Sequence, residues 1–295
     1  MDLRRLRLFL AVVDHGGFTA AAAAVHVAQP ALSLGVRELE RELDAILLVR
    51  SRKGIVLTPA GEALVEPARQ AVRDVEIAVA AVAAVTGVLA GRVDVAALPT
   101  LAADPLAAIA GRFRQAHPQV TVRIVATDDP TDLAQSIRSG HSEIGVTEQG
   151  PANAGLVEHA IADQELVAVC ARTGDADPGV LDLATLSGVP LVLTPPGTSM
   201  RNLVDHALRE LGVTPSIAVE TEQRDALVPL VLAGAGTAFV PRAIAEVASA
   251  QGAIVRRTRP ELRRRVVLVH RSGTLSPAGA QFLVHAQPAR HRAGR

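Results

Sequence analysis

Aromatic residues and cysteine are scarce in this 295-residue sequence. Tryptophan and tyrosine are absent, and only five phenylalanines are present. Binding of single-stranded nucleic acid usually depends on bases stacked on aromatic side chains, so this mode is nearly excluded and duplex DNA is the favoured nucleic-acid partner. The single cysteine, Cys170, excludes an intramolecular disulfide framework and suits a reducing compartment.

An excess of one charge and a long apolar run are also missing. The formal net charge is zero, with 30 basic and 30 acidic residues, so any contact with DNA must come from a local basic patch. Residues 1–5 do not open an apolar signal segment, and the valine- and alanine-rich stretches are too interrupted to span a bilayer. We therefore expect a cytoplasmic protein with no membrane partner.

The sequence motifs of common catalytic sites are absent as well. There is no H-E-x-x-H, no paired-cysteine metal motif and no G-x-S-x-G. Gly234-Ala235-Gly236 resembles part of a dinucleotide-binding loop, but it lacks the third glycine and precedes a predicted strand, which favours a turn. Cys170 lies in an apolar run and is expected to be an inert thiol. We expect no catalytic residue, no metal site and no cofactor, and hence not an enzyme.

What is present is organised around residues 18–39, where two short helical patterns are joined by a tight turn. The hydroxyl of Thr19 can cap the first helix, and Pro30 fits the first turn of the second. Apolar residues of the second helix recur at spacings of four, three and four: Leu32, Val36, Leu39 and Leu43. The opposite face carries Gln29, Ser33 and Arg37. This pattern predicts a helix-turn-helix.

Two further patterns extend this unit. An apolar helix face is predicted from Leu3 to Val13, ended by Gly16-Gly17. Apolar runs at 46–49 and 55–57 flank a basic glycine tip, which predicts a two-stranded wing. Between residues 1 and 60, eight basic residues stand against six acidic ones. Three basic residues gather in the wing, where they can meet phosphates, although a solvated turn is the alternative: Arg50, Arg52 and Lys53.

These residues resemble the DNA-binding domain of LysR-type transcriptional regulators. The resemblance rests on Phe18-Thr19 with the alanine run, Gln29 to Ser33, Arg37 to Glu40 and Leu57 to Glu62, and by length and layout it covers the whole chain. It implies a regulator that binds double-stranded promoter DNA, with RNA polymerase as a further candidate partner. The implied DNA-binding residues are Thr19, Gln29, Pro30, Ser33, Arg37, Arg50, Arg52 and Lys53.

Three positions depart from the family pattern. Ala28, Leu34 and Gly35 stand where the family usually carries serine, arginine and glutamine. These positions are expected to border the face in the major groove. Leu34 can touch a thymine methyl but no phosphate, and Gly35 weakens the helix by about 1 kcal/mol relative to alanine.

A long helix is predicted from Thr58-Pro59, a cap followed by proline, to about Leu89. Apolar residues, several of them small, recur at spacings that alternate between four and three: Leu64, Ala68, Ala71, Val75, Ala78, Val82, Val85 and Leu89. This heptad pattern predicts a coiled coil with a second copy, and an amphipathic helix packed on its own chain is the alternative. The family uses this segment as a dimerisation linker and commonly goes on to tetramers.

From Gly91 onwards strands alternate with helices, which predicts a mostly parallel α/β sheet covered on both faces. The resemblance implies a bilobal effector domain like a periplasmic binding protein, crossed by strands near Glu165–Cys170 and Val266–His270. The predicted domains are a winged helix-turn-helix (1–58), a linker helix (59–90) and an effector-binding domain (91–295). Lobe I is predicted at about 91–163 and 268–287, and lobe II at about 164–267.

Ligands of such folds lie between the lobes, beyond the carboxyl ends of strands. Thr100 follows a strand just before a helix, as do Thr198 and Ser199, and groups at helix starts favour an anion such as a carboxylate. Helix capping is the alternative use of these hydroxyls. The candidate effector-binding residues are Thr100, Leu101, Thr147, Thr198, Ser199 and Glu222.

Two other classes of protein share parts of this pattern. A solute-binding protein has the bilobal ligand fold, but the missing signal segment and the helix-turn-helix disfavour it. A small-molecule enzyme is disfavoured because no nucleophile–base pair or metal set is visible. Binding to the DNA upstream of the gene separates the regulator from both.

Overall fold

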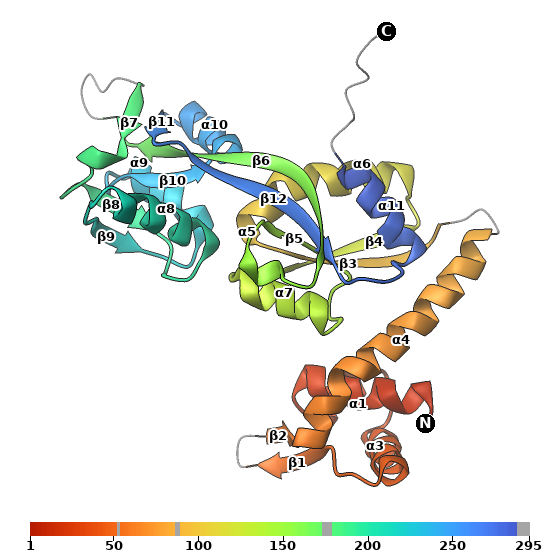
Figure 1. Cartoon of the computed structure of the whole chain (residues 1–295). Helices are drawn as coiled ribbons and strands as arrows, with labels where there is room; N and C mark the ends of the chain where they lie inside the picture. Colours follow the sequence, from red (N-terminus) through yellow and green to blue (C-terminus); the bar gives the residue numbers. More distant parts are fainter. Residues whose placement is uncertain (52–53, 86–88, 173–178, 288–295) are drawn as a thin grey trace.

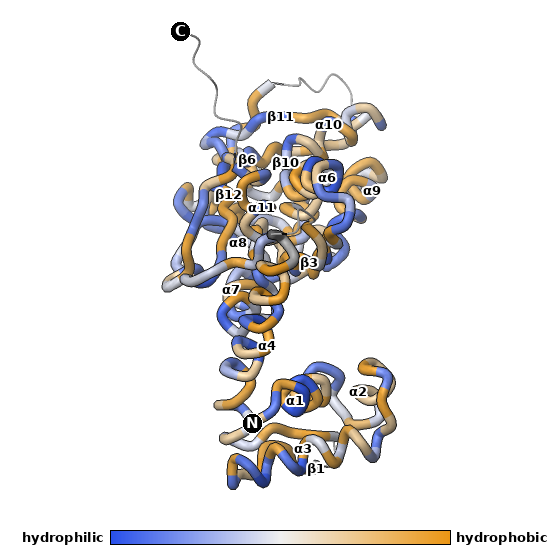
Figure 2. Tube along the Cα trace, turned by 90° about the vertical axis from the view of Figure 1, so that its right-hand side faces the viewer, coloured by the Kyte–Doolittle hydropathy of each residue, from blue (hydrophilic) through white to orange (hydrophobic). Residues whose placement is uncertain are grey.

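The computed structural model describes residues 1–51, 54–85, 89–172 and 179–287. A small helical domain lies at one end of a long helix, α4 (Pro59–Val85), and an α/β domain of two lobes lies at the other (Figure 1). Figure 2, turned by 90°, shows the helical domain below the α/β domain, with α4 running between them. The predicted fold class is confirmed.

The helical domain is a winged helix-turn-helix. Its elements are α1 (Leu3–His15), α2 (Phe18–Ala24), α3 (Gln29–Leu43), β1 (Leu48–Ser51) and β2 (Gly54–Leu57). Asp2 caps α1 by accepting a hydrogen bond from the backbone N–H of Arg4 at 3.1 Å. The stripe on α3 is buried against α1 and α2, and the antiparallel wing pairs Leu48 with Leu57.

Two details of this domain differ from the prediction. Gly17, with extended backbone, precedes α2, and no side chain caps this helix. Thr19 is therefore the second residue of α2 and not its cap. Leu43 is 37% exposed because the helix ends there, as Asp44 turns the chain with a φ of 47°.

Membrane-spanning length was also assessed. No single helix among the described residues is long and apolar enough to cross a bilayer. α1 and α2 reach the required composition only when taken together across a 116° bend, and their apolar faces form the core of the helical domain.

The long helix α4 begins at a side-chain cap. Oγ1 of Thr58 accepts a hydrogen bond from the backbone N–H of Gly61 at 3.0 Å, and Pro59 takes the first helical position, where no donor is needed. The helix is described as far as Val85, and residues 86–88 lie outside the described part of the structure. Leu89, the predicted end, is not helical. Leu89 packs instead against the core of the first lobe.

The predicted heptad seam of α4 is divided between two environments. Leu64, Ala68 and Ala71 pack against α1 of the same chain, so packing on the own chain is the correct interpretation for this part. Val75 and Val82, further along, are 43% and 71% exposed. The stretch that a second copy can cover is therefore shorter than the sequence pattern suggested.

The α/β domain contains the remaining elements. The first are β3 (Gly91–Ala97), α5 (Pro99–Leu101), η1 (Ala102–Leu106), α6 (Ala107–Ala116), β4 (Val120–Ala126), α7 (Pro130–Arg138), β5 (Ile144–Glu148) and η2 (Pro151–Asn153). Next come β6 (Val157–Cys170), β7 (Val180–Asp182), η3 (Leu183–Thr185), β8 (Pro190–Leu193), α8 (Ser199–Glu210), β9 (Ser216–Glu220), η4 (Arg224–Ala226), α9 (Leu227–Leu232), β10 (Ala238–Pro241) and α10 (Arg242–Ala250). The last are β11 (Ile254–Arg259), β12 (Leu262–His270) and α11 (Pro277–Ala286). The sequence pattern missed β7, which is short, and α10, which follows β10 without a turn signal.

The large sheet is mixed and not mostly parallel. β3 pairs in parallel with β4 and β5, as expected for alternating strands and helices. β12, however, runs antiparallel to β5 and β6, and β10 and β11 run antiparallel to β6. The reason is that β6 and β12 cross between the lobes in opposite directions.

Each lobe has its own hydrophobic core. One core contains buried residues of β3, β5, α6 and α11, and the other contains buried residues of β8, α8, α9 and β10. β6 and β12 run side by side from one lobe to the other and contribute to both cores (Figure 1). Side chains at this crossing are therefore placed between the lobes.

The helical domain contacts the first lobe through a polar cluster. Asp14 of α1 accepts a hydrogen bond from Nη1 of Arg69 on α4 at 3.1 Å, and it lies 3.3 Å from Nε2 of His141 in the loop before β5. Arg73 of α4 donates to the backbone carbonyl of Gly140 in the same loop. Burial acts to raise the pKa of Asp14, but hydrogen bonds from His141 and Arg69 outweigh it and lower this pKa to about 2.

Replacing Asp14 by asparagine should weaken this contact. A carboxyl group whose pKa is depressed from 3.8 to about 2 stabilises the folded state above its unfolded pKa, and the contribution is lost as the pH falls through the folded pKa. Between about pH 4 and pH 2 the parent should therefore lose roughly 1 kcal/mol more free energy of unfolding than Asp14→Asn, after allowance for solvent screening. Urea unfolding at both ends of this range measures the difference, with Asp132→Asn on α7 as control. Equal losses in parent and Asp14→Asn would contradict the contact.

Candidate functional site

The exposed face of α3 carries the polar residues predicted to face DNA. Gln29 and Pro30 occupy the first positions of the helix, and Arg37 is exposed two turns further along. Ser33 is half-buried between them, with its Oγ 3.4 Å from Nε2 of Gln29. Thr19 is exposed near the start of α2. Amide and hydroxyl groups at the start of a recognition helix are suited to reading base edges in the major groove.

The acidic residues of α3 have partners inside the helical domain. Glu38 and Glu42 form ion pairs with Arg5. Oε1 of Glu40 accepts from the two backbone N–H groups at the start of the wing, those of Leu47 at 2.8 Å and Leu48 at 3.3 Å. Two basic residues, one turn apart on the exposed face, have no ion-pair partner in the described part of the chain: Arg37 and Arg41. A domain of nearly balanced charge thus presents positive charge beside its polar face, which favours contact with phosphates.

Leu34 and Gly35, two of the three positions that depart from the family pattern, face different sides of α3. A Cβ added at Gly35 would lie 2.5 Å from Cδ1 of Leu8 on α1, so this glycine allows α1 and α3 to pack closely. The expectation that position 35 borders the DNA face is therefore wrong. Leu34 is 57% exposed, and Ala28 precedes the helix without a capping side chain.

The basic wing residues are described only in part. Arg50 lies in β1 opposite Ile55 of β2. Its side chain lies outside the described part of the structure, as do Arg52 and Lys53. Their contact with phosphates stays a prediction.

Two candidate effector residues from opposite lobes are joined by an arginine that sequence reasoning did not single out. Arg264 of β12 donates from Nη2 to Oγ1 of Thr100 at 2.7 Å and from Nη1 to Oγ of Ser199 at 2.8 Å. Its Nε donates to Oε1 of Gln164 on β6 at 2.9 Å. Arg264 therefore connects α5 of the first lobe with α8 of the second.

Two carboxylates make further contacts between the lobes. Oε2 of Glu148, at the end of β5, accepts from the hydroxyl of Ser199 at 2.5 Å and lies 3.9 Å from Nη1 of Arg264. Arg224 of η4 forms a second connection between the lobes, a 2.6 Å ion pair with Asp128 after β4. In this conformation the two lobes are joined directly by side-chain hydrogen bonds and ion pairs.

The other candidate effector residues are placed differently. Thr198 donates its hydroxyl to the carbonyl of Pro195 at 2.9 Å and lies 2.7 Å from a second threonine hydroxyl. Leu101 is fully buried in the core of the first lobe. Thr147 is fully buried as well, and its hydroxyl has no hydrogen-bond partner among the described residues. Glu222 is exposed on the second lobe.

Sequence reasoning missed Arg264, Gln164 and Glu148. The arginine belongs to an Arg-Arg-Arg run that looks like a solvated basic stretch, but Leu262, Arg264 and Val266 are buried and the residues between them are exposed. In a strand every second residue points to the same face, and this period was the signal that could have identified Arg264 as buried. The helix-cap alternative is wrong for the candidate hydroxyls, because neither α5 nor α8 has a side-chain cap at its start.

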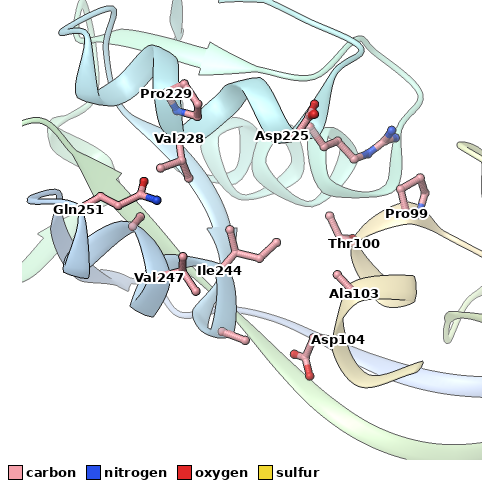
Figure 3. Close-up of a pocket in the computed structure, with 13 residues that line it drawn as sticks. Pro99, Thr100, Ala103, Asp104, Asp225, Val228, Pro229, Ile244, Val247 and Gln251 are labelled. Carbon is pink, nitrogen blue, oxygen red and sulfur yellow. The ribbon is translucent and has the colours of Figure 1, made fainter. Parts of the chain in front are cut away.

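A cavity of about 590 Å³ adjoins this group on the side of α9 and α10 (Figure 3). Thr100 and Asp104 line it from the first lobe, and Val228, Ile244 and Val247 form an apolar wall from the second. Its volume is in the range of small-molecule sites. Within the described ranges, no group of three or more histidine, cysteine, aspartate or glutamate side chains is placed to hold a metal ion.

Comparison with known proteins gives the same two-part division. The profile of the bacterial regulatory helix-turn-helix of the lysR family matches residues 3–62, and that of the LysR substrate binding domain matches residues 86–289. The regulator TfdS of Cupriavidus pinatubonensis is 31% identical over 253 residues, which cover 84% of each chain. The nitrogen assimilation regulatory protein Nac of Klebsiella aerogenes is 30% identical over 281 residues, 94% of this chain and 91% of Nac.

Solved structures agree with this result. The crystal structure of CbnR, a LysR family transcriptional regulator, is similar with a TM-score of 0.67 and 26% identity, over 97% of this chain and 98% of CbnR. Full-length CbnR has also been solved in complex with its target DNA. From its helix-turn-helix to its bilobal domain, this chain belongs to the LysR family of transcriptional regulators, which are not enzymes.

Proposed function

We propose that this regulator acts in the cytoplasm by binding promoter DNA through α3 and the wing, as a dimer that can assemble into tetramers, and that a small molecule bound between its lobes changes the complex. The observation that carries the proposal is the sorting of charge on α3, where acidic residues are paired internally and Arg37 and Arg41 remain exposed. The complex of CbnR with its target DNA supports it. The proposed units are residues 1–58 for DNA binding, 59–90 for dimerisation and 91–295 for the effector.

In this proposal Gln29 and Ser33 read base edges, and Arg37 holds a neighbouring phosphate. A glutamine can make two hydrogen bonds to an adenine edge, and such a pair is worth about 1–3 kcal/mol of discrimination. The wing residues Arg50, Arg52 and Lys53 would neutralise flanking phosphates, which adds affinity without sequence choice. Two copies joined along α4 would present two recognition helices to two half-sites.

The proposed response to an effector follows from the two lobes. A ligand shifts an equilibrium only if it binds one conformation better than another. Thr100 and Ser199 belong to different lobes, so a ligand that touches both makes all its contacts at one lobe spacing. A change of that spacing would reach α1 and α4 through the contact of the first lobe with Asp14, and it would alter how the dimer meets its half-sites. We expect a coupling of about 1–3 kcal/mol between effector and DNA.

Substitutions on α3 test the DNA-binding part. With the DNA upstream of the gene in a mobility-shift titration, Gln29→Ala should lose about 1–3 kcal/mol of preference for the specific site over unrelated DNA. Arg37→Ala should weaken all sequences alike and reduce the slope of log affinity against log salt by about 1. Arg209→Ala, an exposed arginine at the end of α8, is the control and should leave both quantities unchanged.

The outcome also separates the alternative classes. A bilobal solute-binding protein or a small-molecule enzyme would show no salt-dependent shift of upstream DNA. If Arg37→Ala left the salt slope of the parent unchanged, the proposed phosphate contact would be wrong. If the parent did not bind the upstream DNA at all, the regulator would act elsewhere in the genome or not through DNA, and footprinting on genomic fragments would decide between these.

A further inference from the structure

Three arginine side chains are buried in the part of the chain that the structure describes: Arg69, Arg201 and Arg264. Arg69 donates to the carboxylate of Asp14, and Nε of Arg201 donates to both carboxylate oxygens of Asp205 at 2.8 Å. Each of these two has a carboxylate in direct hydrogen-bond contact. Arg264 differs, because its hydrogen bonds go to two hydroxyls and one amide oxygen, all of them neutral.

The guanidinium of Arg264 is thus a buried charge without a hydrogen-bonded counter-ion, and its ion pair with Glu148 is long. Oε2 of Glu148 lies 3.9 Å from its Nη1 and is hydrogen-bonded to Ser199 instead. Burial lowers the pKa of Arg264 to about 10, although the negative charges of Glu148 and Asp104 act to raise it and nearby Arg224 lowers it further. An anion in direct contact with Arg264 would recover free energy that this burial costs.

Glu148 carries the carboxylate that pairs with Arg264 across 3.9 Å. Its backbone is fixed in β5 by pairing with Val266 of β12, while its side chain reaches across to the hydroxyl of Ser199 on the other lobe. The side chain is 23% exposed, so this position is reachable from solvent. Thr100 accepts from Arg264, and in the described hydrogen bonds its own hydroxyl hydrogen has no acceptor.

We propose that Glu148 occupies the carboxylate subsite of the effector in the ligand-free protein, and that the effector is a small carboxylate anion that displaces Glu148 and binds Arg264 directly. This inference rests on the proposed effector role of the cleft and adds the chemical class of the ligand. A planar guanidinium pairs with a carboxylate through two parallel hydrogen bonds, which are stronger than bonds to neutral oxygens. The apolar wall of the adjoining cavity suits the hydrocarbon body of such an anion (Figure 3).

Chemical rescue tests this subsite without knowledge of the natural effector. Glu148→Ala removes the carboxylate from a fixed backbone and leaves a space that acetate can fill. In the full-length protein the unfolding temperature is followed while acetate is titrated against a constant ionic strength of chloride. Glu148→Ala should unfold below the parent and recover by about 3–5 °C at ten times the dissociation constant of acetate. The parent should respond little, because Glu148 fills the position.

Matched controls isolate the charge and the position. Acetamide has the shape of acetate without its charge and should give no recovery. Glu158→Ala removes another partly buried carboxylate, one that contacts Asn153 and no arginine among the described contacts, and it should not respond to acetate. Glu148→Ala combined with Arg264→Met should lose the response. Glu148→Gln keeps the side-chain volume and should not be recovered by acetate, because no space is left.

Several outcomes would overturn the proposal. Equal acetate responses of the parent and Glu148→Ala, a response that persists without Arg264, or recovery by acetamide would each remove the subsite. Inorganic phosphate that stabilises Glu148→Ala at lower concentration than acetate would overturn the carboxylate assignment. Promoter binding by the parent is measured separately by mobility shift, so a failure of this inference is distinguished from a failure of the proposed function.

Discussion

A variant with glutamate at Val75 and Val82 of α4 is expected to be monomeric at micromolar concentration and to lose binding to promoter DNA with two half-sites. Both valines are exposed in the single chain, at 43% and 71%, and they lie seven residues apart on one face of the helix. In a dimer along this face the four glutamates would be buried close together, at a cost on the order of 3–5 kcal/mol. The dissociation constant of the dimer should rise by about 10²- to 10⁴-fold. Light scattering measures the mass and a mobility shift measures the DNA complex.

Two controls make this result specific. Val75→Ile with Val82→Ile keeps the face apolar and should stay dimeric. Ala81→Glu places one carboxylate on an exposed position about 120° around the helix and should leave the mass unchanged. A glutamate variant that remains dimeric would exclude this half of α4 as the dimer contact and point to the α/β domains instead.

The DNA-binding domain was predictable because its signals are local. The stripe from Leu32 to Leu39, the proline at the start of α3 and the glycine tip of the wing each specify structure within a few residues. The heptad seam was predicted too long because its signal is local as well. A pattern on one helix does not reveal whether a partner or the same chain covers it, and α1 covers Leu64 and Ala68.

The centre of the cleft could not be predicted in this way. Thr100 and Ser199 were suggested by their places at helix starts, which is local information. The group that joins them was not, because Arg264 is 164 residues from Thr100 in the chain and reaches it only through the crossing of β6 and β12. The antiparallel return of β12 also makes the sheet mixed, and an alternation of strands and helices along the sequence contains no signal for it.

The start of α4 packs unusually close to the wing. A Cβ added at Gly61 would lie 2.2 Å from the carbonyl oxygen of Leu47 and 2.9 Å from Cδ2 of Leu57. That carbonyl cannot move easily, because it accepts from the backbone N–H of Thr58 at 3.0 Å and lies 3.3 Å from the hydroxyl of the same residue. Gly61 therefore sets the distance between α4 and the two strands.

Gly61→Ala should destabilise the DNA-binding domain by about 3 kcal/mol, since a backbone clash in a packed contact has to be relieved by moving α4 away from the wing. Urea unfolding followed by circular dichroism measures the loss, and faster hydrogen exchange of the wing strands should locate it. Gly111→Ala is the matched control: this glycine lies on the exposed side of α6 with no atom within 4 Å of an added Cβ. The same change there should stabilise the protein by up to about 1 kcal/mol, because alanine is the better helix former. The same substitution thus changes stability in opposite directions in the two helices because the packing around the two glycines differs. A Gly61→Ala protein as stable as the parent would contradict the close approach of Leu47.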